Sequence, residues 1–435
     1  MVYYIWKERV NIVQILTRLL SEDMKPALGV TEPGAIAYAV AKACTYVTGE
    51  WEQIKVRLNS GIYKNGFTCG IPNSDEVGNV FAAALGAVCG KAHLLLQSLD
   101  SITEEDTKAA KKLVDEGKVQ VFMDHISSDI FIEATVVSTK GNCVVTIRER
   151  HTNVTKIVRD GEIVFEGESP VDDTKRETSI KDFAIEDFIS YVNDVPLEEI
   201  SFIREAFLMN MDLLEAGLAS DKTIFAKQLF LENENRLISQ DGLKTAQLLC
   251  NGAIEARVLG CAQPAMSITG SGAHGIIATM PLFAYYQVNL GVVDDDVLIR
   301  ATALGFLVTQ YIKAFSGVLS SLCGCAIGAG TGMACGLAYL RGASYIEIHH
   351  VILNMASGMT GMICDGGNPG CVMKGIVAVD AAFRAVDFAM QGLYVGEKHG
   401  INGQTAEKTL QNMGKIAFPG MASTEEEIVD IIRNK

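Results

Sequence analysis

The sequence predicts an α+β fold, with a large, mainly helical domain that bears the candidate site and a smaller α/β lobe that contains an antiparallel sheet. Three observations lead to this prediction. Hydrophobic residues make up 49% of the 435 residues and charged residues only 20%, as in a chain with a large buried core. Between residues 118 and 167, short segments alternate apolar and polar residues between Gly and Asn turns, as strands do. Almost everything after residue 183 has the longer apolar period of helices.

Each part of the chain has its own pattern. Two N-terminal helices are interrupted around residues 25–33 by two prolines and a glycine. The lobe begins with a strand and two helices and ends with a meander of strands. A charged stretch without apolar periodicity is the predicted linker. Four units are predicted. Residues 1–50 are N-terminal helices that pack on the helical domain, and residues 51–170 are the α/β lobe. Residues 171–182 are the linker, and residues 183–435 are the helical domain.

Charge and hydropathy exclude several functional classes. A formal net charge of −15 argues against a nucleic-acid partner, because phosphate binding requires clustered Lys and Arg. Residues 258–293 and 314–340 are nearly free of charge, but prolines and glycines interrupt them, so we expect buried helices and no membrane partner. Lys7, Glu8 and Arg9 interrupt the apolar N-terminus, so it does not resemble a signal peptide and predicts a cytoplasmic protein.

The eleven cysteines are not a disulfide framework, because the count is odd and the predicted compartment is reducing. Most of them are interpreted as small core residues within helical or strand patterns. This interpretation applies to Cys44, Cys89, Cys143, Cys250, Cys261 and Cys335.

Two further cysteines flank a glycine-rich loop. Cys364 and Cys371 lie seven positions apart, with three glycines and one proline between them, so the segment cannot be a regular helix. Glycines allow a backbone to fold tightly around a cofactor, and thiolates with nearby N–H donors are what an iron–sulfur cluster requires. Spacing alone leaves open whether the loop binds a metal.

A further ligand would come from Cys323 or Cys325, which lie two residues apart and so do not share a helical face. The pair is consistent with a helix start at which one thiol faces a site and the other is packed. Zinc is the competing metal, but its structural sites normally need four ligands in short knuckle spacings, which are not found here.

Polar residues in three other segments are candidates for substrate chemistry. His274 follows Ser271 and Gly272 in a Gly-rich loop, where a buried structural histidine and a general base are both compatible with the pattern. Lys64 and Asn65 follow a predicted strand; they are either exposed loop residues or ligands of a small carboxylate.

Two more candidates lie after the first proline-containing break. Thr31 is a candidate helix cap, and Glu32 would lie in the first turn of the same helix, where a carboxylate suits the helix dipole.

Six ordered blocks together resemble the L-cysteine desulfidase family, which is related to the alpha chains of iron–sulfur L-serine dehydratases. The resemblance covers nearly the whole chain, and the cysteine loop and the TEP block are its most specific parts. The blocks are ALGVTEPGAIA, IYKNGFTCGIP, TGSGAHGI, CGCAIGAGTG, GMICDGGNPGC and GINGQTAEKTLQNMGKIAFPGM.

The resemblance implies a cytoplasmic lyase that uses a [4Fe–4S] cluster and no pyridoxal phosphate. Three cysteines would hold the cluster: Cys364, Cys371 and Cys325, with Cys323 as the alternative to Cys325. The implied reaction is β-elimination on a small amino acid, which yields pyruvate and ammonia, and also sulfide if L-cysteine is the substrate. The abundance of apolar and small residues is compatible with a homo-oligomer.

Roles for the other candidates follow from the same resemblance. His274, Glu32 and Lys64 are the expected catalytic residues, with His274 as the base. The expected substrate-binding residues are Thr31, Asn65, Ser271 and Gly272.

One residue departs from the pattern of the family. Its first block usually reads ALGCTEP, with a cysteine thought to assist catalysis, whereas this chain has Val30. A valine neither accepts a proton nor binds iron, so the substrate is an open question. The alternative is a catalytically inactive iron–sulfur or small-molecule sensor.

Overall fold

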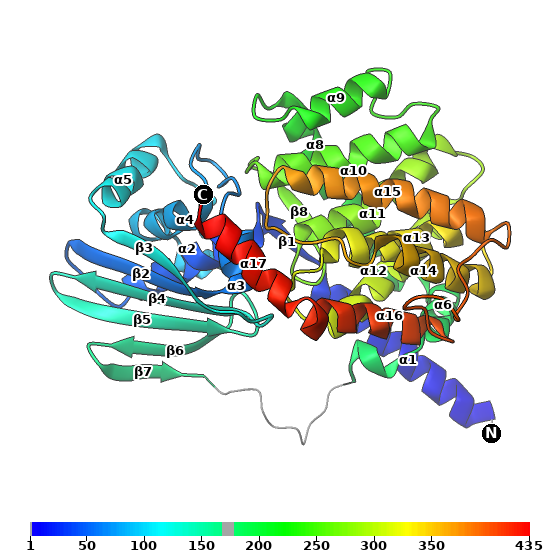
Figure 1. Cartoon of the computed structure of the whole chain (residues 1–435), viewed down its shortest axis with the longest axis horizontal. Helices are drawn as coiled ribbons and strands as arrows, with labels where there is room; N and C mark the ends of the chain where they lie inside the picture. Colours follow the sequence, from blue (N-terminus) through cyan, green and yellow to red (C-terminus); the bar gives the residue numbers. More distant parts are fainter. Residues whose placement is uncertain (1, 168–177) are drawn as a thin grey trace.

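The computed structural model describes residues 2–167 and 178–435, with only the backbone described for residues 2–11. Most of the predicted linker lies outside the described residues; its last part forms a short 3-10 helix, η2 (Ile180–Asp182). The fold is α+β, as predicted. An α/β lobe and a larger helical domain lie side by side, each with its own hydrophobic core (Figure 1).

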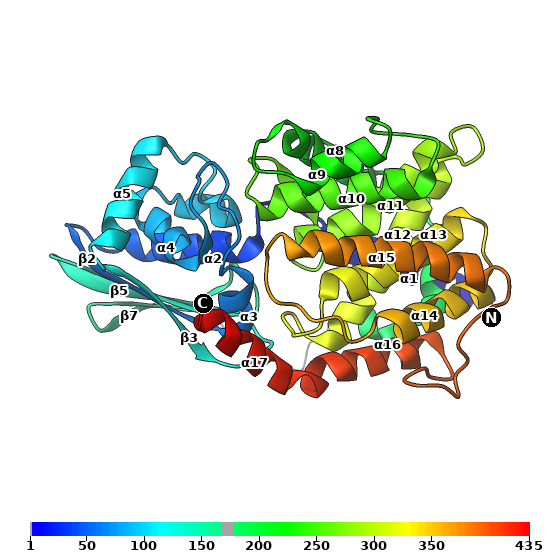
Figure 2. The same ribbon diagram turned by 45° about the horizontal axis from the view of Figure 1, so that its top comes forward.

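The lobe consists of a twisted sheet with helices on one face (Figure 2). The apolar face of the sheet packs against α2 and α4, and strands such as β4 alternate buried and partly exposed residues, as a half-buried strand does. The elements of the lobe are α2 (Thr31–Cys44), β2 (Trp51–Asn59), α3 (Ser60–Asn65), α4 (Gly78–Val88), η1 (Ala92–Gln97), α5 (Glu104–Asp115), β3 (Val119–His125), β4 (Phe131–Ser138), β5 (Gly141–Arg148), β6 (Val154–Arg159) and β7 (Glu162–Glu166).

The sheet is mixed, whereas the sequence predicted an antiparallel one. Its order is β3-β2-β4-β5-β6-β7, and every pair is antiparallel except β2 and β3, which are parallel. The helices α4 and α5 form the crossover between these two strands. The prediction of an antiparallel meander was wrong for β3, because alternation identifies a strand but not the direction of its neighbour.

The helical domain surrounds the long buried helices α11, α12 and α13. Its elements are α1 (Val2–Asp23), β1 (Lys25–Leu28), α6 (Ile185–Asp194), α7 (Leu197–Ile200), η3 (Ser201–Ile203), α8 (Arg204–Ala219), α9 (Phe225–Glu232), α10 (Gly242–Val258), β8 (Pro264–Ser267), α11 (Gly272–Val288), α12 (Asp295–Ser316), η4 (Gly324–Ala329), α13 (Gly330–Leu340), α14 (Tyr345–Met359), α15 (Gly370–Ala389), α16 (Ala406–Lys415), η5 (Ile416–Gly420) and α17 (Ala422–Arg433).

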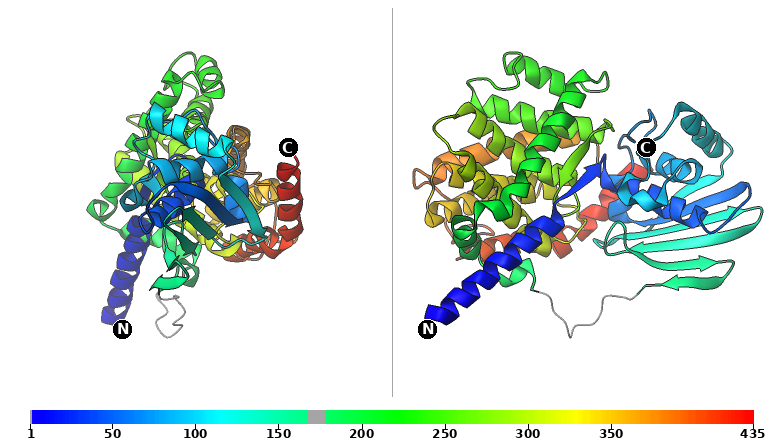
Figure 3. Two further views of the ribbon diagram at one scale, coloured as in Figure 1. Left: turned by 90° about the vertical axis from the view of Figure 1, so that its left-hand side faces the viewer. Right: turned by 180° about the vertical axis from the view of Figure 1, so that it is seen from behind.

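Segments from both ends of the chain connect the two parts. α1 lies against α6 and α12 of the helical domain, and Figure 3 shows it leading into β1 beside the lobe. The break predicted at residues 25–33 contains β1, which pairs antiparallel with β8. The next helix, α2, packs in the core of the lobe instead of on the helical domain, because its apolar side chains face α4 and the sheet. At the other end, α17 reaches from the helical domain to α3 of the lobe (Figures 1 and 2).

Among the described residues, α12 is the one helix long and apolar enough to cross a membrane. However, 78% of its most apolar 18-residue window is buried inside the protein. Its neighbours on several sides are α11, α13 and α16. This burial indicates a core helix.

Candidate functional site

Two cysteine-containing loops of the helical domain are joined by backbone hydrogen bonds. The N–H of Cys323 donates to the carbonyl oxygen of Met362 at 2.9 Å, and the N–H of Cys364 donates to that of Ser321 at 2.6 Å. Cys371 follows in the first turn of α15, and its thiol contacts the carbonyl oxygen of Gly366 at 3.5 Å. The structure therefore brings the cysteines of both predicted motifs to one place.

The predicted helix start at the CGC motif is a π-helix, η4 (Gly324–Ala329), which begins between the two cysteines. Cys323 is buried, whereas Cys325 is half-buried and keeps partial access to solvent. Cys323 is among the groups whose charge raises the pKa of Cys364 and Cys371, and Cys325 acts on Lys313. Both thiols thus face the same neighbourhood, and the choice of the third ligand between them stays a prediction.

Glycines allow the loop before α15 to approach the lobe. Gly366 has a φ of +107°, and a Cβ atom there would lie 2.4 Å from the carbonyl oxygen of Lys64. The N–H of Gly367 donates to the carbonyl oxygen of Asn65 at 3.0 Å. Only glycine permits both the positive φ and this close contact, so the cysteine loop can lie directly on α3.

Burial and nearby lysines have opposite effects on the pKa of the thiols. Desolvation raises the pKa of Cys371 to about 12 and also raises the pKa of Cys364. The positive charges of Lys64 and Lys374 lower the pKa of Cys364, but by less than burial raises it. The thiols are therefore protonated in the absence of another cation, and a bound metal would supply the charge that favours the thiolates.

The residues around the two cysteine loops can be compared with what a larger cofactor needs. An iron–sulfur cluster occupies the space between its thiolate ligands, so those ligands lie farther apart than the ligands of a single ion. Converging thiols, neighbouring lysines and a glycine loop that contributes backbone amides are compatible with that larger group.

His274 lies in the first turn of α11 and faces the CGC motif. A Cβ atom on Gly324 would lie 3.0 Å from its Nε2 atom. On the other side of the ring, Nδ1 is 2.5 Å from the hydroxyl oxygen of Thr269, and that hydroxyl donates to the carbonyl oxygen of Ile268 at 2.8 Å. With the hydroxyl proton directed to Ile268, Nδ1–H would be the donor to Thr269. In that tautomer the basic lone pair is on Nε2, on the side of the cysteines.

The surroundings of His274 keep the imidazole neutral. Burial, together with the charges of Lys313 and Arg257, lowers its pKa to about 3 from the ordinary value of 6.5. Asp23 opposes this shift weakly; its carboxylate accepts hydrogen bonds from the N–H of Thr269 and from Gln310. A neutral imidazole can accept a proton, although a pKa this low makes it a weak base.

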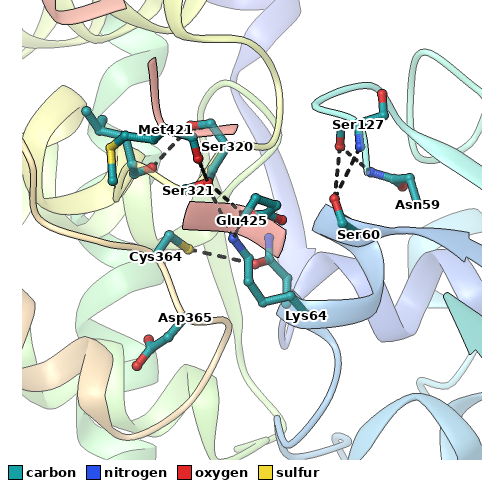
Figure 4. Close-up of polar contacts among 12 residues, drawn as sticks. Asn59, Ser60, Lys64, Ser127, Ser320, Ser321, Cys364, Asp365, Met421 and Glu425 are labelled. Carbon is teal, nitrogen blue, oxygen red and sulfur yellow. Dashed lines mark hydrogen bonds and ion pairs between the residues drawn. The ribbon is translucent and has the colours of Figure 1, made fainter. Parts of the chain in front are cut away.

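Lys64 is buried in α3 and forms an ion pair with α17. Its side chain is 1% exposed, and Nζ is 2.5 Å from Oε2 of Glu425. The same carboxylate accepts a hydrogen bond from Oγ of Ser321 at 3.0 Å (Figure 4). The carbonyl oxygen of Ser321 accepts the bond from Cys364 N–H. Lys64 was expected in a loop, but it lies in a helix, and its charge is matched by Glu425.

The other predicted residues lie at the boundary between the lobe and the helical domain. Asn65 donates through Nδ2 to Oε1 of Glu32 at 2.8 Å, and its Oδ1 is 3.8 Å from Sγ of Cys364. The hydroxyl of Thr31 donates to the carbonyl oxygen of Gly270 at 3.1 Å, next to Ser271. These contacts connect the start of α2 with the loop before α11.

Val30 is buried where the family pattern has cysteine. A Cβ atom on Gly367 would lie 3.1 Å from Cγ1 of Val30, so this side chain packs against the loop between Cys364 and Cys371. In the sequence, Val30 is a departure within the TEP block. In the structure, it lies beside the loop that carries the thiols.

Four charged or titratable side chains near the site were missed by sequence reasoning. Lys313 and Arg257 are isolated basic residues in apolar helical segments, and that pattern is a usable signal for function. Glu425 lies in an acidic run that resembles a solvated helix face, and His151 lies in a strand-connecting turn, so neither carries a signal in the sequence. His151 is buried beside Gly270, with an unpartnered Nε2 atom.

A separate surface groove of about 550 Å³ is lined by residues such as Asn73, Lys111, Lys222 and Cys261. None of the four thiols of the candidate site lines this groove. The candidate site is therefore distinct from it.

Comparisons with known proteins identify the family of this chain. The family described as serine dehydratase alpha chain matches residues 93–430. A UPF0597 protein of Clostridium botulinum is 40% identical over 96% of this chain and 98% of its own length, and one of Caldanaerobacter subterraneus is 39% identical over 97% and 98%. The one from Clostridioides difficile is 33% identical over 96% and 98%. The family match contains His274 and all the candidate thiols, while the relatives also cover the TEP block. The chain therefore belongs to the serine dehydratase alpha chain family, together with the UPF0597 proteins.

Proposed function

We propose that this protein is an iron–sulfur-dependent lyase that removes the β-substituent of a small amino acid such as L-serine or L-cysteine. The observation that carries the proposal is the position of His274. Its Nε2 atom faces the backbone of Gly324, which lies between Cys323 and Cys325. Membership in the serine dehydratase alpha chain family supports the lyase class.

The thiols of Cys364, Cys371 and one of the pair Cys323 and Cys325 would hold a [4Fe–4S] cluster. When bound there, such a cluster would supply Lewis-acid assistance to a departing hydroxyl or thiol group. The Lys64–Glu425 pair fixes Ser321 and through it the backbone of Cys364. This network sets the spacing between the two cysteine loops.

The protein's own residues would transfer the proton. His274 is neutral, and its Nδ1–H is held by Thr269, so Nε2 can accept the α-proton of a substrate bound beside Gly324. Loss of the β-substituent with its electron pair then gives aminoacrylate. Its imine tautomer is hydrolysed by water to pyruvate and ammonia; L-serine also releases water and L-cysteine releases hydrogen sulfide.

The direct test is anaerobic reconstitution with iron and sulfide, followed by a screen for pyruvate release from small amino acids. We expect turnover of L-serine, L-cysteine or a close analogue. Val30 is the observation that favours the second candidate, a sensor, because a valine beside the cysteine loop cannot take part in proton transfer. Binding of these amino acids without pyruvate release would contradict the lyase and favour the sensor.

Replacing His274 by asparagine is expected to lower kcat by about 10²- to 10⁴-fold, because a positioned general base contributes that factor. The value of KM and the iron content should change little. Because the pKa of His274 is about 3, the wild-type rate should show no loss near pH 6.5 that arises from this imidazole.

The matched control for this variant is His399→Asn, at an exposed loop position. It should leave both kinetic constants unchanged. A His274→Asn protein with full iron content and wild-type kcat would exclude His274 as the base.

A further inference from the structure

Arg257, in the last turn of α10, is a buried cation without a counterion. Arg257 is 5% exposed, and its Nε atom is buried without a hydrogen-bond partner. No described residue forms an ion pair with its guanidinium group. Burying a charge without a partner is costly, and buried arginines are normally paired. An anion that is not part of the protein chain would balance the charge of this guanidinium group.

The other buried or partly buried lysines around the site are already engaged. Lys64 pairs with Glu425 at 2.5 Å, and Lys374 pairs with Asp365. Lys313 donates through Nζ to the carbonyl oxygen of Val318 at 3.1 Å. Lys313 likewise has no carboxylate partner, but within the described part of the chain Arg257 alone among these four cations has a buried nitrogen, Nε, without a hydrogen-bond partner.

Nearby carboxylates do not neutralise Arg257 either. Glu32 accepts a hydrogen bond from Asn65, and Asp23 accepts bonds from Thr269 and Gln310. Neither carboxylate forms an ion pair with the guanidinium group in the described structure. Both carboxylates are therefore engaged by other residues, and the guanidinium group is left without an anionic partner among the described residues.

The guanidinium lies against the N-terminal end of α11. A Cβ atom on Gly272, the first residue of this helix, would lie 2.6 Å from Nε of Arg257. The N-cap residue, Ser271, makes no side-chain capping bond, so the first-turn amides are not capped from within. A helix of 17 residues carries a partial positive charge at this end. The arginine and the helix end therefore act on the same small volume.

We propose that Arg257 and the first turn of α11 bind the α-carboxylate of the amino-acid substrate. A guanidinium offers two parallel N–H donors, which match a carboxylate better than the single ammonium group of a lysine. Helix N-termini bind anions through their free amides. Because His274 is in the same first turn, a carboxylate bound there would keep the rest of a small amino acid close to His274. This assignment rests on the proposed lyase function and adds the residue that anchors its substrate.

Binding can be measured by isothermal titration of anaerobically reconstituted protein that carries His274→Asn, so that turnover adds little heat; in this comparison, wild-type means the protein with Arg257 unchanged. The probes are L-serine, L-cysteine and L-serinamide, in which a neutral amide replaces the carboxylate. We expect the wild-type protein to bind at least one of the two amino acids, and to bind L-serinamide at least tenfold more weakly than L-serine if L-serine binds. Arg257→Lys should weaken amino-acid binding about tenfold, because one charge remains but the bidentate contact is lost. Arg257→Gln should weaken it further.

Two additional variants separate this role from a structural one. Gly272→Ala keeps the charge but places a methyl group against the guanidinium, so it should weaken amino-acid binding in folded protein. Arg236→Gln removes an exposed arginine whose ion pair with Glu234 is long, at 3.9 Å, and should leave binding unchanged. The visible spectrum of the reconstituted protein should be the same in all variants. In a protein that turns over, Arg257→Lys should raise KM far more than it lowers kcat.

The outcomes for the two proposals are distinguishable. Unchanged binding and KM in Arg257→Lys and Gly272→Ala would overturn the carboxylate site, even if the enzyme releases pyruvate. No binding of either amino acid by wild-type protein would also overturn it. Arg257-dependent binding of an amino acid without pyruvate release would support this site and contradict the lyase.

Discussion

Replacing Cys371 by alanine is expected to abolish both the iron content and the lyase activity of anaerobically reconstituted protein. Cys371 is one of three proposed ligands, and it is the only cysteine in α15. Removing a ligand leaves the site with too few thiolates to retain a cluster. Iron and acid-labile sulfide analysis, together with the loss of the brown absorbance, measures this effect independently of turnover.

The matched control is Cys250→Ala, because Cys250 is also a free cysteine but is fully buried in α10. This change should cost only about 1 kcal/mol of stability and leave the iron content unchanged. Cys364→Ala should behave like Cys371→Ala. Full iron and sulfide content in both of these variants would contradict the cluster assignment.

The same assay decides between Cys323 and Cys325. The variant that loses iron identifies the third ligand, and the other should retain it.

Replacing Glu425 by alanine is expected to destabilise the protein by about 3–5 kcal/mol, because it leaves the ammonium group of Lys64 buried without a counterion. Lys64 is 1% exposed and Glu425 is 7% exposed, so water cannot replace the lost partner without a structural change. The variant also removes the hydrogen bond from Ser321. Urea denaturation followed by circular dichroism measures the shift.

Glu426→Ala is the control for this prediction, since Glu426 is the next residue in α17 and is exposed. It should change stability by less than about 0.5 kcal/mol. Removing both charges in Lys64→Met with Glu425→Leu should restore much of the lost stability, because no uncompensated charge remains. A loss below about 1 kcal/mol for Glu425→Ala would show that the pair is not the link between α17 and the lobe that we infer.

Several features of the fold could be predicted because their signals are local. Alternation identified the strands between residues 118 and 167. Thr103 with Asp106 caps α5, one of the helices expected early in the lobe. Strand direction was not predictable for β3, since its partner is fixed by the length of the intervening crossover and by packing on α4. The position of α2 in the lobe likewise depends on which apolar surface it packs against, and that surface comes from residues distant in sequence.

The cysteine loop at residues 364–371 could be recognised from the sequence alone, because its glycines and proline exclude a helix and its thiols suggest a chemistry. The family resemblance then predicted an iron–sulfur cluster as the cofactor. The sequence also identified His274 as a candidate base, although the same pattern was compatible with a buried structural histidine. These inferences depend on residue types within a few positions of each other.

Only the tertiary structure decided which charges are matched. Lys64 and Glu425 are 361 residues apart in the chain, and no local pattern indicates that they form a buried pair. Arg257 became informative only through the lack of a partner in its folded surroundings. The sequence by itself thus determined the elements and the thiols of the candidate site. The packing of the lobe on the helical domain determined its electrostatics, because the energy of a buried charge depends on neighbours that are distant in sequence.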